Sequence, residues 1–150
     1  MNTLFFLSVL SLASHNPNTM IVAKNIRYII QYFEVEESLI HKDIGLISSL
    51  DNEAIEQLIN FLTIEYPGIK IKHYSSDSIK NNLCLNSEHH LFIKIPEGIL
   101  QTSQGVFKYS FQSRLRNIFG TFEIELKAED GRVTIVREQF FTTSIGQREF

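Results

Sequence analysis

Cysteine, glycine and proline are scarce in this 150-residue chain, and tryptophan is absent. Its single cysteine, Cys84, excludes an intramolecular disulfide framework and cannot build a cysteine-based zinc site. Because Cys84 lies between two leucines and has no charged neighbour to activate its thiol, we interpret it as a small buried hydrophobic residue. With only 7 glycines and 3 prolines, and 21% charged residues, the composition excludes a low-complexity or disordered chain.

The sequence also lacks a cluster of positive charge. Its formal net charge is −3 and its pI is about 5.9. The densest basic feature is the spaced pair Arg114 and Arg116. Proteins that bind nucleic acid neutralise phosphates with grouped lysines and arginines. We therefore expect no nucleic-acid partner.

No apolar run reaches the length of about 20 residues that a membrane-spanning helix needs. The longest run, Leu4 to Ala13, has the length of a signal peptide. However, a signal peptide has basic residues before its apolar run, and the first basic residue of this chain is Lys24, after the run. We expect no permanent membrane anchor and a cytoplasmic protein, with export through an N-terminal signal peptide as the alternative. Residues 1–19 are then a signal peptide or an N-terminal extension, because Ser14 to Thr19 contains helix-breaking residues, and residues 20–150 form a single domain.

What the chain does contain is apolar residues, 43% of the total with 12 phenylalanines, enough for a real core. Between Ile21 and Phe33 apolar residues recur every three or four positions, which predicts a helix. Residues 34–49 are less regular and are interpreted as a connector or a short second helix. Asp51 begins the clearest helix, which runs to about Tyr66 and is stopped by Pro67 and Gly68.

Alternation of apolar and polar residues predicts strands in the rest of the chain. Between two of them, Asp130-Gly131 supplies the positive φ angles of a tight hairpin turn. A short helix is expected through Leu85. The predicted strands cover residues 69–74, 91–95, 105–111, 122–127 and 133–137.

This order predicts an α+β fold, with two N-terminal helices packed on a curved antiparallel sheet of about five strands. No alternation of strands with crossover helices is evident, so no parallel pairing is expected. The expected architecture resembles the cystatin or NTF2 type, in which a curved sheet wraps around a helix. That resemblance implies a fold and not an activity, because such sheets serve both binding proteins and enzymes.

Motifs that would identify chemistry are few. His89 and His90 follow Glu88, but neighbouring residues of a strand point to opposite faces, so the two imidazoles do not readily share one ion. His73 or His41 would have to complete such a site. Gly-x-Ser-x-Gly and phosphate-binding glycine loops are lacking. The sequence therefore assigns no catalytic residue, no cofactor and no metal.

Two functional hypotheses remain. The first is a small non-enzymatic binding or interaction protein, of immunity, inhibitor or adaptor type, that holds a protein partner. The second is a pocket-bearing, NTF2-like enzyme or a carrier of a small ligand. The acidic residues Glu34, Glu36 and Glu37 are the candidate contact for a basic partner, and the alternative is a solvated acidic turn. The sequence leaves the oligomeric state open.

Overall fold

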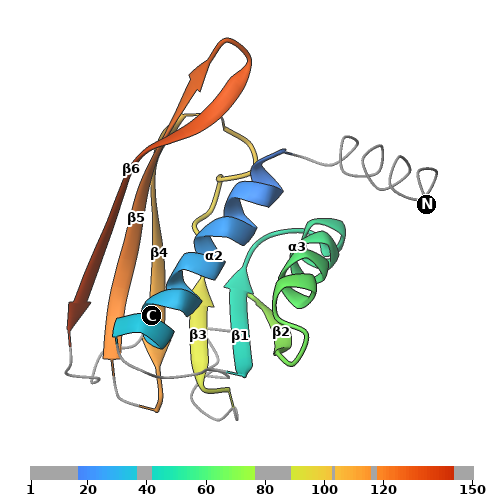
Figure 1. Ribbon diagram of the computed structural model, residues 1–150. Coiled ribbons are helices and arrows are strands. Elements are labelled where there is room, and N and C mark those ends of the chain that lie inside the picture. The colour runs from blue at the N-terminus through green and yellow to red at the C-terminus, as the bar shows by residue number, and fades with distance from the viewer. Residues whose placement is uncertain (1–16, 37–41, 77–88, 103, 116–117, 144–150) are drawn as a thin grey trace.

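The computed structural model describes residues 17–36, 42–76, 89–102, 104–115 and 118–143. Its strands form one six-stranded sheet in the order β2-β1-β3-β4-β5-β6. Two helices, α2 and α3, cover the same face of this sheet (Figure 1). The elements are α2 (Pro17–Glu36), β1 (Asp43–Ser48), α3 (Asn52–Glu65), β2 (Lys70–Ser75), β3 (Leu91–Lys94), β4 (Gly105–Ser113), β5 (Ile118–Glu129) and β6 (Arg132–Thr143).

The fold is α+β, as the sequence predicts, but the sheet is mixed. β1 pairs in parallel with both β2 and β3, whereas β3 to β6 are antiparallel. The prediction of an antiparallel five-stranded meander preceded by both helices is therefore wrong. α3 connects the parallel strands β1 and β2, so the chain contains a βαβ unit. The cystatin or NTF2 resemblance predicted an antiparallel sheet, and the sheet differs from it in these parallel strands.

β1 is the strand that the sequence did not predict. It occupies part of the segment interpreted as a connector or short helix. Ile44 and Leu46 are fully buried under the helices, and Ile47 is fully buried on the opposite face. Parallel strands that are covered on both faces have continuous apolar sequences instead of alternation. This is why the period-two signal is missing here.

The helices follow from local sequence. Asp51 caps α3, because its carboxylate accepts a hydrogen bond from the Ala54 amide at 2.8 Å. α2 begins earlier than predicted, at Pro17, a residue that suits a first helical turn. Asn18 is buried and its side-chain amide donates to the carbonyls of Ile99 and Thr102, at 2.8 and 2.7 Å. The predicted break over residues 14–19 is therefore wrong from Pro17 onward.

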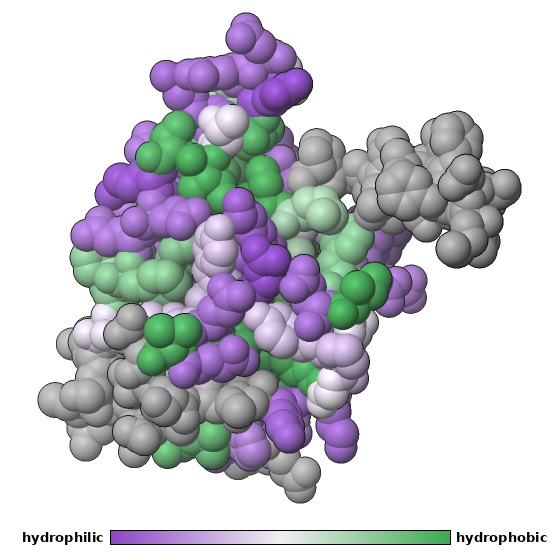
Figure 2. Space-filling model, viewed as in Figure 1, coloured by the Kyte–Doolittle hydropathy of each residue, from purple (hydrophilic) through white to green (hydrophobic). Residues whose placement is uncertain are grey.

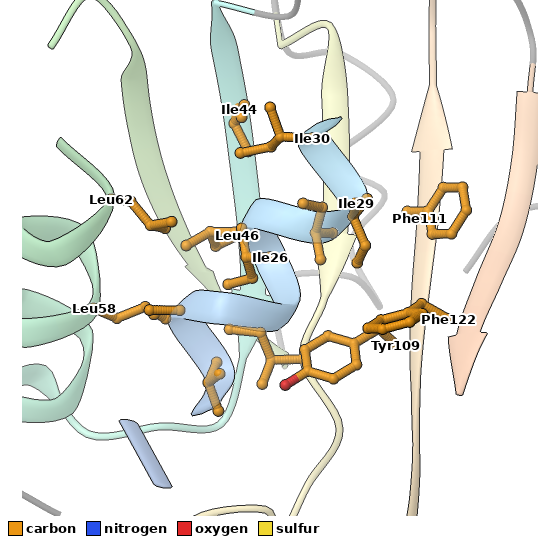
Figure 3. Packing of buried hydrophobic residues seen from close by; sticks show 14 of the residues in the cluster. Ile26, Ile29, Ile30, Ile44, Leu46, Leu58, Leu62, Tyr109, Phe111 and Phe122 are labelled. Atoms are coloured by element: carbon orange, nitrogen blue, oxygen red, sulfur yellow. The ribbon is translucent and has the colours of Figure 1, made fainter. Parts of the chain in front are cut away.

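The core lies between the two helices and the sheet (Figure 3). Leu58 and Leu62 of α3 point toward α2 and β1, and the aromatic residues of β4 and β5 close the other side. One polar contact is buried within it, since the side-chain amide of Asn25 donates to the Tyr109 hydroxyl at 3.0 Å. Burial raises the pKa of the Tyr109 phenol. The labelled core residues are Ile26, Ile29, Ile30, Ile44, Leu46, Leu58, Leu62, Tyr109, Phe111 and Phe122.

The predicted hairpin from Phe122 to Arg137 is confirmed, and its strands are longer than expected. Asp130 and Gly131 form its turn with φ angles of 52° and 76°. The predicted strands at 69–74, 91–95 and 105–111 are also present as β2, β3 and β4. The expected helix through Leu85 lies outside the described residues. The hairpin extends well beyond the ends of the two helices (Figure 1).

Candidate functional site

The outer edge of β6 is the longest stretch of backbone at the border of the sheet. β6 is last in the strand order, and among the described elements it pairs only with β5. Its register shifts near the middle, where Arg137 faces Glu125 and Ile135 faces Leu126, so Val136 is the extra residue of a bulge. Bulges and charges make an edge harder to extend. The regular part of the edge is therefore residues 137–143.

A groove of about 320 Å³ lies beside this part of the edge, between α2 and β6. Its wall is aromatic, because Tyr32 stacks on Phe140 with ring centroids 5.1 Å apart, and Phe140 stacks on Phe122 at 4.4 Å. The Tyr32 hydroxyl also donates to Thr142 on β6 at 3.5 Å. The two walls of the groove, α2 and β6, are therefore fixed to each other by the contacts of Tyr32 with Phe140 and Thr142. Its lining residues are Tyr28, Gln31, Tyr32, Val35, Glu138 and Phe140.

The same face of the hairpin is apolar further toward its tip. Figure 2 shows hydrophobic side chains gathered over the upper part of the sheet, beyond the end of α2. Phe107, Val133 and Ile135 pack against the edge of the core and are only half-buried. The opposite face of the hairpin is polar, and Arg137 there pairs with Glu123 at 2.8 Å and with Glu125 at 3.5 Å. Apolar surface is thus left uncovered beside the β6 edge.

Two of the three acidic residues predicted to contact a partner lie in a helix and not in the expected connector, so that part of the prediction is wrong for them. Glu34 and Glu36 belong to the last turn of α2, which contains no basic residue, and Glu37 lies outside the described residues. Glu34 is half-buried and faces Tyr66, whose pKa is raised by burial first and then by the Glu34 carboxylate. Sequence reasoning did not identify Glu138, the carboxylate in the groove beside β6. The Glu138 carboxylate and the negative, C-terminal end of the α2 dipole make this end of the groove electronegative.

Two of the candidate histidines, His73 and His89, form hydrogen bonds away from this groove, and His41 lies outside the described residues. His89 Nδ1 lies 2.5 Å from Asp43 Oδ1, and its Nε2 lies 2.7 Å from the Tyr74 hydroxyl. Asp43 is on β1, Tyr74 on β2, and His89 comes just before β3, so the network joins the three parallel strands. His90 is exposed. We interpret this network as structural, since both imidazole nitrogens of His89 already have partners.

A second pair joins Ser48 and His73 at the other end of the parallel strands. Ser48 Oγ lies 2.7 Å from His73 Nε2 and accepts a hydrogen bond from the Leu50 amide at 3.2 Å. Ser48 is only 1% exposed, so its hydroxyl is closed to a substrate. The pair fixes the turn between β1 and α3. Burial lowers the pKa of His73, although hydrogen bonding to the Ser48 backbone acts in the opposite direction.

This burial predicts a stability that depends on pH. In the unfolded chain His73 titrates near 6.5, and in the folded protein its pKa is lower. The unfolded state therefore binds the proton first as the pH falls below about 6.5, which lowers the free energy of unfolding. The stability that the neutral, buried His73 contributes is therefore fully present only above that pH. We expect urea unfolding at pH 7.5 and pH 5.0 to differ less in His73→Gln than in the wild type, and equal differences would contradict this.

Comparisons with known proteins give no further assignment: no protein-family model, curated protein or solved structure matches this chain. Within the described ranges, no three histidine, cysteine, aspartate or glutamate side chains are grouped to hold a metal ion. No helix in this part of the chain is long and apolar enough to cross a membrane. The β6 edge and the groove beside it are therefore the candidate functional site.

Proposed function

We propose that this protein is a non-enzymatic interaction protein that holds an extended segment of a protein partner along the outer edge of β6. The observation that carries the proposal is the coincidence of a strand edge, open over residues 137–143 of the described structure, with an aromatic groove directly beside it. An extended peptide can add a strand to such an edge through main-chain hydrogen bonds. Every second side chain of that peptide would then face the groove.

The groove and its charges define the chemistry of the bound segment. An apolar or aromatic side chain fits against the stacked rings of Tyr32 and Phe140, which lose little conformational entropy on binding because they are already packed. A neighbouring lysine or arginine fits Glu138 and the carboxyl end of α2. We therefore propose a basic segment with at least one large apolar residue.

The alternative of a pocket-bearing enzyme has less support. Of the residues that line the groove beside β6, only Glu138 carries a charge near neutral pH, and it is exposed. His73 and His89 are engaged in the hydrogen bonds described above, away from this groove. An acid–base site would need at least one titratable side chain that is buried and points into a pocket.

The test uses a displayed library of random 12-residue peptides selected against the full chain. The affinity of a selected peptide is then measured for the wild type, for Glu138→Pro and for Gln139→Pro. Adjacent residues of an antiparallel strand direct their amides to opposite sides, so one proline interrupts pairing with β5 while the other only removes an outward donor. Unfolding experiments identify which variant remains as stable as the wild type.

In that stable variant we expect the affinity for the selected peptide to fall at least about tenfold, because main-chain bonds are lost at the edge. The charge contribution is tested by Glu138→Lys, with Glu97→Lys as the matched control on an exposed turn. Glu138→Lys should slow association at low ionic strength, and much less at high salt. Wild-type affinity in the stable proline variant would contradict the proposal.

A further inference from the structure

A second groove, of about 360 Å³, lies between α2 and α3 on the opposite flank of α2 from β6. Two nearly buried residues that belong to the core, Ala23 and Leu62, are among its lining residues. At its rim, Met20 is 48% exposed and Ile64 is 77% exposed. Two large apolar side chains are therefore exposed to solvent at the rim of a groove whose lining is itself largely apolar.

The charged residues of this groove are mainly cationic. Lys24 and Arg27 lie one helical turn apart on α2, and Glu65 is the one acidic lining residue. Lys24 has no carboxylate partner among the described residues, and its Nζ lies 5.6 Å from the centre of the Tyr28 ring. Arg27 pairs with Glu65 through Nη1 at 3.2 Å, but its buried Nε has no hydrogen-bond partner within the described structure. The guanidinium is thus incompletely satisfied.

We propose that this groove binds a single-chain amphiphile with an anionic head group, such as a free fatty acid. The hydrocarbon chain would cover the apolar lining between the helices, and the carboxylate would lie at the rim beside Lys24 and Arg27. The volume is at the lower end of the range for small-ligand sites, which suits one chain and not two. The proposal does not depend on the β6 edge, because the two grooves lie on different flanks of α2.

The probe is dodecanoate, kept below its micelle-forming concentration and titrated into the full chain by calorimetry and by amide NMR. We expect saturable binding that perturbs residues of the α2–α3 groove, and about two- to fourfold weaker binding for each methylene removed from the chain. Dodecyltrimethylammonium, which has the same chain and a cationic head, should bind at least about threefold more weakly.

Two variants separate the chain from the head group. Ile64→Asn replaces an exposed apolar rim residue by a neutral polar one, so it leaves the fold and the charge of the groove unchanged, and it should weaken dodecanoate binding at least about fivefold. Lys24→Glu should weaken dodecanoate and favour the cationic amphiphile, whereas Lys108→Glu, on the exposed face of β4, is the matched control and should change neither.

Three results would overturn the proposal. The first is no saturable binding of dodecanoate, and the second is equal affinity for the two head groups. The third is a dimer in sedimentation that Ile64→Asn converts to a monomer, since a second copy of the chain would then be the occupant of the groove.

Discussion

Replacing Leu58 by alanine is expected to lower the free energy of unfolding by about 2–5 kcal/mol. Leu58 is 1% exposed and points from α3 toward Ile26 and Leu46, at the place where both helices meet the sheet (Figure 3). The substitution removes buried apolar surface and leaves a cavity that the surrounding helices and strand can fill only in part. Urea or thermal unfolding measures the change.

Ile64→Ala on the same helix is the matched control, because Ile64 is 77% exposed. It should change the free energy of unfolding by no more than about 0.5 kcal/mol. If Leu58→Ala were equally mild, the face of α3 that contains Ile55, Leu58 and Leu62 would not be the core face.

Replacing Gly45 by alanine is expected to cost about 1–3 kcal/mol by overpacking. A Cβ atom at this position would lie 2.7 and 2.8 Å from two ring carbons of Phe92, which is 2% exposed and has little room to move. It would also lie 3.4 Å from the ring of His89, within the network that joins β1, β2 and β3. Circular dichroism during urea unfolding measures the loss.

Gly68→Ala is the control for this substitution. A Cβ atom at Gly68 meets nothing within 4 Å, and this glycine is not in the positive-φ region. We expect Gly68→Ala to be neutral or slightly stabilising, because alanine restricts the unfolded chain more than glycine does. A loss at Gly68 as large as that at Gly45 would show that contact with Phe92 is not the cause.

The parts of the fold that could be predicted from the sequence are those whose signals are local. Asp51 caps α3 and Pro67-Gly68 follows its end, so the whole helix is specified within one short stretch. Asp130-Gly131 likewise specifies the hairpin, because the turn requires their φ angles and the flanking strands alternate around a half-buried sheet.

β1 could not be predicted for the opposite reason. Its identity depends on its tertiary neighbours, because β2 and β3 pair with its two edges and α2 and α3 cover the face that contains Ile44 and Leu46. Because the sequence does not predict β1, it does not predict the parallel pairing of β1 with β2 and β3 either. Burial on both faces removes the alternation by which single strands are detected.

The candidate site is likewise assembled from distant residues. Tyr32, which lines the groove, is 110 positions from its hydrogen-bond partner Thr142 on β6, and His89 and Asp43 are 46 positions apart. Phe140 stacks on the buried ring of Phe122, but its own half-buried ring also lines the groove. Closeness in the sequence selects the acidic residues Glu34, Glu36 and Glu37, but it does not select Glu138, which lines the groove.

The most direct test of β6 as the binding edge is amide hydrogen exchange of the full chain with and without the library-selected peptide. Strand addition should slow exchange at alternate residues within 137–143, since only every second amide of the edge points outward. The opposite border of the sheet, β2, should exchange as before. Protection that appears along Lys70–Ser75, or that leaves residues 137–143 unchanged while the peptide is bound, would contradict the proposed function.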